Sequence, residues 1–183
     1  TSIQAFGLTE PNAGSDSTAI ETFAERDGDE YMIDGQKIWI SRVDATDYIV
    51  LMARTTPKSE VEKRTEGISM FLVDLDDIRR QGNFEMRSIP KTATRAVHSY
   101  GVWFEGARVP AENLIGTEGN GFYQVLDGLN EERLVIAAEC IGLGEAALMA
   151  GVEYAGDRDV FDRPIGKNQA IQHPLAEAYA HLM

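Results

Sequence analysis

The sequence predicts an α+β fold, in which an antiparallel, β-barrel-like domain is followed by the first helices of an α-helical bundle. Short β-prone runs alternate with turn residues through about residue 110. From Asn120 onward, apolar residues recur with the period of a helix. A linker over residues 110–116 separates the two patterns. We therefore expect a β-domain over residues 1–113 and a helical domain over residues 114–183.

Each predicted strand is a run of β-branched, aromatic and aliphatic residues. The clearest signal is a hairpin over residues 31–41, because Asp34 and Gly35 form a turn dipeptide between two β-prone arms. The other strands are expected to begin near Thr22 and to cover residues 48–53, 68–73, 84–89 and 99–104. Residues 57–67 are charged and bounded by proline and glycine, which indicates an exposed loop.

The helical part begins with Phe122, Val125 and Leu129, which follow one helical face. Ala, Leu and Glu then dominate to about residue 155, which predicts one long helix or two helices broken near residues 142–144. Proline and glycine within residues 158–167 predict a loop. A last helix is expected to begin near Asn168.

Composition excludes several classes of function. The net charge of −13, without a basic patch, argues against binding to nucleic acid. The single cysteine, Cys140, excludes an internal disulfide. We expect no membrane span, because no apolar stretch was found to approach the length of about 20 residues that a span needs. No metal site is expected. The first residue is not Met and the sequence stops within an apparent helix, so we expect a part of a longer protein.

The loop over residues 8–17, LTEPNAGSDS, has more small hydrogen-bonding groups than packing alone requires. Its Thr-Glu-Pro and Ala-Gly-Ser-Asp segments resemble the flavin-loop motif of the acyl-CoA dehydrogenase family. Three further matches follow in the order of that family: Trp-Ile-Ser at 39–41, Arg-x-x-Phe-x-x-Pro at 158–164, and Gln169. The resemblance covers almost the whole chain and implies the middle β-domain and the start of the C-terminal helical domain.

The resemblance implies a site for FAD. A flavin ring needs hydrogen bonds along its polar edge, a flat apolar wall and donors for its pyrophosphate. Gly14 allows close approach of the backbone, and Trp39 offers a large flat face. By family analogy, the cofactor-binding residues are Phe6, Leu8, Thr9, Gly14, Ser15, Trp39, Ile40, Ser41, Arg158, Phe161 and Gln169. One departure is Asp162, where the family usually has glycine after the phenylalanine. The alternative is a core tryptophan beside an ordinary surface loop.

The implied activity is that of an FAD-dependent oxidoreductase, the α,β-desaturation of an acyl-CoA thioester. In the isovaleryl and long-chain branches of the family the catalytic base lies just before an arginine on the first helix of the C-terminal domain, so the resemblance points to Glu132. In other members the base lies later, beyond this sequence, and Glu132 would then only line the pocket or face solvent. The substrate-binding residues implied are Ser15, Thr55, Asn130 and Arg133.

The resemblance also implies partners. These are the acyl-CoA substrate, an electron-transferring flavoprotein as electron acceptor, and further copies of the chain in a dimer or tetramer. The expected location is the bacterial cytoplasm, or the mitochondrial matrix if the source is eukaryotic. Two alternatives remain. One is an acyl-CoA oxidase or another flavin oxidase or monooxygenase on the same fold. The other is a binding or DNA-protection module without enzymatic activity, against which the negative charge argues.

Overall fold

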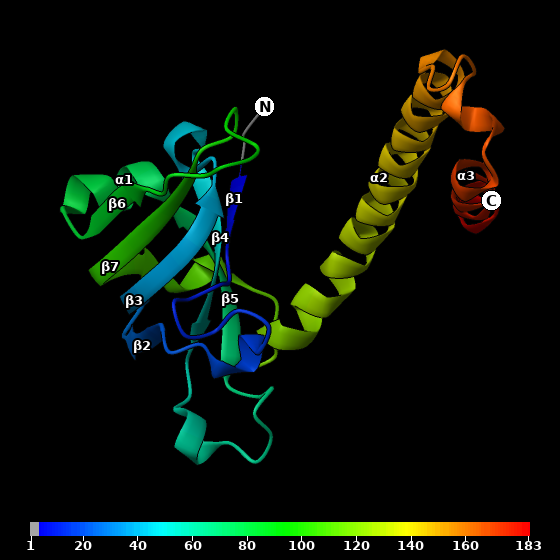
Figure 1. Ribbon diagram of the computed structural model, residues 1–183. Coiled ribbons are helices and arrows are strands. Elements are labelled where there is room, and N and C mark those ends of the chain that lie inside the picture. Colours follow the sequence, from blue (N-terminus) through cyan, green and yellow to red (C-terminus); the bar gives the residue numbers. More distant parts are fainter. Residues whose placement is uncertain (1–3) are drawn as a thin grey trace. The chain divides into compact units, whose positions relative to one another are not determined.

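The computed structural model describes residues 4–183 and divides the chain into two compact units (Figure 1). We call Thr1–Leu126 the β unit and Asp127–Met183 the helical unit. The sequence predicted a division at residues 113 and 114, whereas the compact units divide after Leu126. The difference arises because the first residues of the long helix α2, Gly121–Asp157, belong to the β unit.

The β unit is built on one eight-stranded sheet. Its strands are β1 (Gln4–Gly7), β2 (Phe23–Asp27), β3 (Glu30–Ser41), β4 (Tyr48–Arg54), β5 (Ile68–Asp74), β6 (Phe84–Ser88), β7 (Ser99–Pro110) and β8 (Leu114–Ile115). The order is β6-β7-β3-β2-β4-β5-β8, and β1 pairs with β4. The predicted α+β class is confirmed.

Two details of the predicted sheet are corrected. The sheet is mixed and not purely antiparallel, because β4 pairs in parallel with β1 and, at Phe23 and Arg54, with β2. The parallel pairing of β2 with β4 follows from the path of the chain. Strand β3 runs antiparallel to β2, and β4 then runs back in the direction of β2 and lies on the side of β2 opposite to β3. The sheet is also not closed into a barrel, since β6 and β8 lie at its two ends.

The predicted hairpin over residues 31–41 is wrong, because these residues lie in the single strand β3. Both halves of β3 pair with β7, and the register shifts between Ile33 and Gly35. Gly35 has a φ of +147°, and a Cβ atom there would lie 2.6 Å from Oγ1 of Thr22. Glycine is therefore required here for an irregular strand and a close approach, not for a turn. The turn lies earlier, at Gly28, between β2 and β3.

A short helix, α1 (Leu75–Gln81), interrupts the predicted all-β region. The Asp74 side chain caps it by accepting a hydrogen bond from the backbone N–H of Asp77. Gly82 ends it in the left-handed conformation. Arg79 and Arg80 lie in the last turn, where positive charge favours the helix dipole. The sequence predicted only strands and turns in this region, so α1 is a correction to the predicted β-domain.

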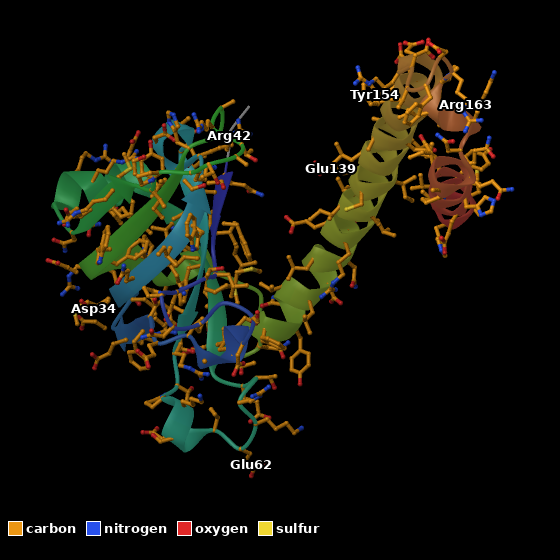
Figure 2. All side chains as sticks on the ribbon, viewed as in Figure 1. Asp34, Arg42, Glu62, Glu139, Tyr154 and Arg163 are labelled. Carbon is orange, nitrogen blue, oxygen red and sulfur yellow. The ribbon has the colours of Figure 1, made fainter. Side chains whose placement is uncertain are left out.

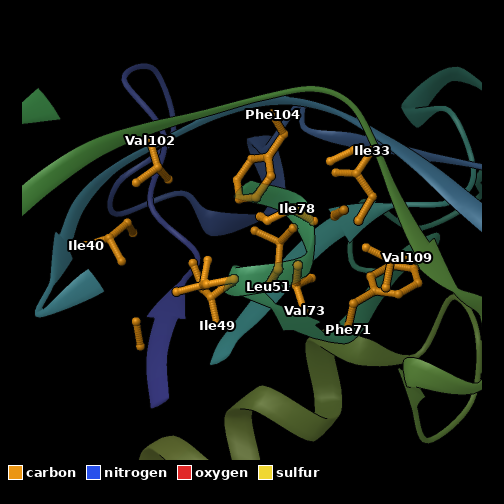
Figure 3. Packing of buried hydrophobic residues seen from close by; sticks show 14 of the residues in the cluster. Ile33, Ile40, Ile49, Leu51, Phe71, Val73, Ile78, Val102, Phe104 and Val109 are labelled. Atoms are coloured by element: carbon orange, nitrogen blue, oxygen red, sulfur yellow. The ribbon is translucent and has the colours of Figure 1, made fainter. Parts of the chain in front are cut away.

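The core lies inside the β unit (Figure 3). Tyr31 and Phe71 are fully buried and pack edge to face, with ring centroids 4.9 Å apart. Leu51 and Phe104 come from other strands, and Ile78 brings α1 into the same cluster. Burying each such side chain stabilises the fold by about 1.5–3 kcal/mol relative to leaving it in water. This core supports the strands that present the candidate site.

The helical unit, in contrast to the β unit, buries few of its side chains. Helix α2 is unbroken, and α3 (Gln169–Leu182) begins after Asn168 as predicted. Within residues 127–183, Ala155 is the only buried residue. Side chains project along α2, Glu139 and Tyr154 among them (Figure 2). Its exposed apolar side chains include Leu134, Val135, Ile136, Ile141, Leu143, Met149 and Val152. This unit therefore leaves most of its apolar surface uncovered.

The apolar character of α2 corrects the expectation that no apolar stretch of the sequence approaches the length of a membrane span. The helix contains an 18-residue window with a mean hydropathy of 1.7, so it is long and apolar enough to cross a membrane. Length and composition are the only grounds for a span, and the core helices of helical bundles share both. This feature alone does not assign α2 to a membrane.

Candidate cofactor site

The loop after β1 is held in a tight turn. The backbone of Glu10 donates to the carbonyl of Ala13, and Ala13 donates back to Glu10, both at 3.1 Å. Gly14 and Ser15 follow in an exposed position, and a Cβ atom on Gly14 would meet nothing within 4 Å. The loop is thus ordered by its own turn, while the residues proposed to bind a cofactor remain accessible.

The same loop is bonded to β3 beside Trp39. The backbone N–H of Ile38 donates to the carbonyl of Thr9 at 2.9 Å. The structure therefore brings together two sequence motifs, residues 8–15 and 39–41, that were predicted separately to bind one flavin.

A bulge in β3 exposes Trp39. The register of β3 against β7 shifts between Lys37 and Ile40, and Trp39 has a φ of +64°, a value that non-glycine residues rarely adopt. The Trp39 side chain is 53% exposed, whereas Ile40 is buried in the core. Trp39 is therefore not a core tryptophan, and only the backbone of Ile40 remains to contact a ligand.

Two further predicted residues lie on the surface of the β unit. Phe6 is outward on β1, between the buried residues Ala5 and Gly7. Ser41 is exposed, and its hydroxyl lies 3.4 Å from that of Ser99, which is buried. An aromatic face, exposed hydroxyls and an open glycine backbone are the groups that a flavin requires, so the residues present fit this cofactor.

Thr55 has a different environment. Its hydroxyl is 2.8 Å from that of Ser69, which in turn accepts a hydrogen bond from the backbone N–H of Gly119 at 2.8 Å. The backbone N–H of Thr55 donates to the carbonyl of Gly67. Among the contacts of residues 4–183, none joins Thr55 to Ser15, and the proposed substrate role of Thr55 stays a prediction.

A buried ion pair lies beneath the loop. Nζ of Lys37 is 2.7 Å from Oε1 of Glu10, and the side chains are 0% and 7% exposed. Burial would raise the pKa of Glu10, but the Lys37 charge and hydrogen bonds from Lys37 and the Thr22 and Glu21 backbone together lower it. Burial lowers the pKa of Lys37 to about 8, against the opposing effect of Glu10. Both groups are charged at neutral pH.

Sequence reasoning missed this pair. Glu10 belongs to the loop motif and Lys37 to a predicted strand, and neither pattern by itself indicates that the two side chains meet. A signal was available, because Lys37 falls at the same alternating positions of β3 as Tyr31 and Ile33, where a charged side chain is uncommon unless it is paired.

In the helical unit, Glu132 lines an open cavity of about 350 Å³. The other lining residues are Leu129, Arg133, Ile136 and Ala137, so most of its neighbours are apolar. Arg133 donates a hydrogen bond to the side-chain oxygen of Asn130 at 2.8 Å. Three predicted residues, Asn130, Glu132 and Arg133, therefore lie within one turn of α2, and Glu132 remains exposed within this unit.

The Arg-Phe-Pro motif forms a small hairpin turn. Val160 donates to the carbonyl of Arg163 at 3.0 Å, and the turn residues Phe161 and Asp162 have φ values of +52° and +57°. Phe161 is 94% exposed at the tip of the turn. Asp162 is exposed, and Arg163 bonds Asn168 at 2.9 Å. The unusual aspartate is thus directed to solvent and does not pair with Arg163.

Arg158 and Gln169 flank this turn. The carbonyl of Arg158 accepts a hydrogen bond from the backbone of Ile165 at 2.8 Å, while the residue itself is exposed. Gln169 is the first residue of α3 and is also exposed. Both residues are accessible on the helical unit, as a role in binding a ligand requires, and that role stays a prediction.

Comparison with known proteins agrees with this geometry. Residues 5–107 match the model of the acyl-CoA dehydrogenase middle domain, and residues 119–183 match the model of the acyl-CoA dehydrogenase C-terminal domain. Cyclohex-1-ene-1-carbonyl-CoA dehydrogenase of Geobacter metallireducens is 37% identical over 177 residues, which are 97% of this chain and 45% of that protein. Mitochondrial isovaleryl-CoA dehydrogenase of Oryza sativa subsp. japonica is 34% identical over 180 residues, 98% of this chain and 42% of that protein.

The fold is similar to that of a solved structure, butyryl-CoA dehydrogenase from Megasphaera elsdenii. The TM-score is 0.86 at 33% sequence identity, over 99% of this chain and 46% of that one. The chain thus spans less than half of the length of these relatives. The family-model matches cover both units, and the middle-domain match alone covers more than half of the chain. The chain belongs to the acyl-CoA dehydrogenase family.

Proposed function

We propose that this chain forms part of an FAD-dependent oxidoreductase that desaturates an acyl-CoA thioester between its α and β carbons. The observation that carries the proposal is the exposed Trp39, which a bulge with a positive φ presents beside the loop of residues 8–15. A strained backbone at an exposed aromatic residue is typical of a binding site. The activity is proposed for the enzyme at the full length of the family.

The β unit would hold the flavin ring. Trp39 supplies the flat face, and Thr9, Ser15 and Ser41 supply hydroxyl groups at the polar edge and the pyrophosphate. We assign Arg158, Phe161 and Gln169 to the remainder of the cofactor, in a site completed by a neighbouring subunit. Arg158 suits a pyrophosphate because its planar guanidinium donates two hydrogen bonds at once. When bound, the flavin supplies the acceptor for the hydride that leaves the β carbon.

Glu132 is proposed as the catalytic base. Its carboxylate takes the proton from the α carbon, so that a new O–H bond forms as the C–H bond breaks. Glu132 is exposed in this unit, and three of its neighbours in the open cavity, Leu129, Ile136 and Ala137, are apolar. If other segments of the full-length enzyme cover these side chains, the carboxylate would lie in an apolar pocket, which favours a general base. Asn130 and Arg133, hydrogen-bonded to each other, would contact the substrate near this base. Ser15 and Thr55 would contact the CoA part.

The partners are proposed from membership of the family. An electron-transferring flavoprotein would accept the electrons, and the enzyme would form a dimer or tetramer. The location would be the bacterial cytoplasm, or the mitochondrial matrix in a eukaryote. Relatives named as dehydrogenases favour this reading over an oxidase. The discriminating measurement is the rate at which the reduced flavin reacts with oxygen, which an oxidase makes fast.

The proposed base is tested in the full-length enzyme with Glu132→Gln. This variant keeps the shape of the side chain but removes its basicity. A positioned general base contributes about 10²- to 10⁴-fold in rate, so stopped-flow reduction of the flavin by substrate should slow by that factor. FAD content and acyl-CoA affinity should stay close to those of the wild type.

Glu131→Gln is the matched control, because it removes the neighbouring carboxylate from the same helix and should change little. Reduction of the Glu132→Gln enzyme at nearly the wild-type rate would contradict the assignment and place the base elsewhere. The 183-residue chain by itself should bind FAD weakly or not at all, because the rest of the site comes from other segments and another subunit. A micromolar affinity in fluorescence titration would contradict this division of the site.

A further inference from the structure

The buried pair of Lys37 and Glu10 connects three segments of the β unit. Nζ of Lys37, on β3, donates to Oε1 of Glu10 at 2.7 Å and to the carbonyl of Leu8 at 3.2 Å. The two carboxylate oxygens of Glu10 also accept hydrogen bonds from the backbone N–H groups of Thr22 and Glu21, at 3.0 Å and 2.6 Å. The loop is thereby bonded to β3 and to the segment just before β2.

This pair is poorly explained as a stabilising element. A buried ion pair loses the hydration of both charges, and replacing it with neutral groups is often harmless. Burial lowers the pKa of Lys37 to about 8 despite the adjacent carboxylate, so its ammonium is less favourable here than in water. Another role is needed to account for two charges within an apolar unit.

The geometry supplies that role, because the pair sets the direction of the peptide group between Leu8 and Thr9. Lys37 draws the Leu8 carbonyl inward. In a trans peptide the N–H of the next residue points the opposite way, so the Thr9 N–H is turned away from Lys37. The Thr9 carbonyl is fixed in turn by Ile38, the neighbour of Trp39. The polar edge of the loop is therefore oriented by Lys37 and Glu10 while Trp39 is held beside it.

We propose that Lys37 and Glu10 are positioning residues that fix the loop of residues 8–15 in its cofactor-binding conformation before the cofactor arrives. The inference rests on the proposed function, because it assigns that loop to the flavin. Neither side chain touches the ligand, since both are buried beneath the loop. Residues that hold the contacting groups of a site typically change affinity by about 10- to 100-fold when they are replaced.

The test compares Lys37→Met, Glu10→Gln and the double variant. Lys37→Met alone leaves a buried carboxylate without its partner and should lower the melting temperature. The double variant removes both charges and should recover most of that loss. In the double variant, amide hydrogens of residues 8–15 in the 183-residue chain should exchange about 10- to 100-fold faster, and the full-length enzyme should bind FAD more weakly by a similar factor.

An exposed pair provides the matched control. Arg87 and Glu85 lie 2.7 Å apart on β6 with side chains 70% and 55% exposed, and Arg87→Met with Glu85→Gln should leave the loop unchanged. Wild-type exchange of the loop in the Lys37 and Glu10 double variant would overturn the proposal. Faster exchange with unchanged FAD affinity would also overturn it. Absence of FAD binding by the wild-type full-length enzyme would instead refute the proposed function, because the exchange measurement needs no cofactor.

A pH profile separates positioning from a structural role. Glu10 is bonded to Lys37, and Arg54 of β4 interacts electrostatically with the same carboxylate. Above a pH of about 8 the native chain loses the Lys37 proton, while the unfolded chain keeps it to near the ordinary value of 10.5. The Lys37 contribution to the free energy of unfolding therefore rises with pH in this window. FAD affinity should fall over the same window, because neutral Lys37 holds the carboxylate less strongly.

Between about pH 7.5 and 9.5, a window around the Lys37 pKa of about 8, the Lys37 contribution to the free energy of unfolding should rise while FAD affinity falls. In the double variant, the fall in FAD affinity should disappear. A wild-type affinity that is flat across this window, or that falls equally in the double variant, would contradict the positioning role.

Discussion

The two units of this chain differ most in how completely they bury their own apolar side chains. The β unit encloses Tyr31, Phe71 and Phe104 almost completely, and its buried cluster draws on most of its strands. Within residues 127–183 only Ala155 is buried, and Leu134 is 73% exposed. Both units contain proposed site residues.

The two halves of the proposed chemistry therefore have different structural support. The residues assigned to the flavin ring lie on strands and a loop that are fixed by a packed core and a buried ion pair. The proposed base lies on a helix whose tertiary packing is sparse within its own unit. Most helix stability in proteins comes from tertiary packing. We therefore expect the β unit to be rigid in this chain and the helical unit to open readily.

The largest expected effect is a difference in amide hydrogen exchange between the two units. In the monomeric 183-residue chain, amides in the middle of β4 should open only through global unfolding, whereas those near Leu143 on α2 should open locally. With a typical global stability of at least about 5 kcal/mol, protection should differ by about 10³-fold or more. Equal protection in both places would show that the helical unit is as stable as the β unit.

A pair of truncations should give the next largest effect. Phe71→Ala removes a fully buried ring that packs on Tyr31, and it should cost about 3–5 kcal/mol of unfolding free energy. Leu143→Ala, at a position that is 63% exposed, should change it by no more than about 0.5 kcal/mol. Urea denaturation measures both, with tryptophan fluorescence reporting on the β unit, which contains Trp39 and Trp103, and far-UV circular dichroism reporting on the helices of the helical unit. Comparable losses for the two variants would break the contrast between the units.

The sequence was most informative where one signal had one structural meaning. The long helical period, the charged loop over residues 57–67 and the helix start after Asn168 were all predicted. The dipeptide of Asp34 and Gly35 misled, because glycine also serves close approach inside a strand. The true turn, at Gly28, carries the same Asp-Gly signal.

The sequence named a set of proposed site residues, which stays a prediction, but it did not predict their geometry. Local sequence motifs identified the loop and Trp39 separately, through their resemblance to a family. Their contact depends on a hydrogen bond between Ile38 and Thr9, and the exposure of Trp39 depends on a bulge against β7. Both are long-range consequences of strand register, which a local pattern does not encode. The strand pattern indicates that Lys37 needs a partner, but it does not identify Glu10 as that partner, for the same reason.

The most direct test of the account asks whether the flavin lies against Trp39 in the full-length enzyme. Fluorotryptophan can be incorporated, and the ¹⁹F resonances of Trp39 and Trp103 can be assigned from Trp39→Phe and Trp103→Phe. Trp103 is the matched reference, because its ring is covered by the Arg87 guanidinium at 5.3 Å. We predict that FAD shifts the Trp39 resonance more than that of Trp103. A Trp39 resonance that stays in place while FAD is bound would contradict the proposed cofactor site.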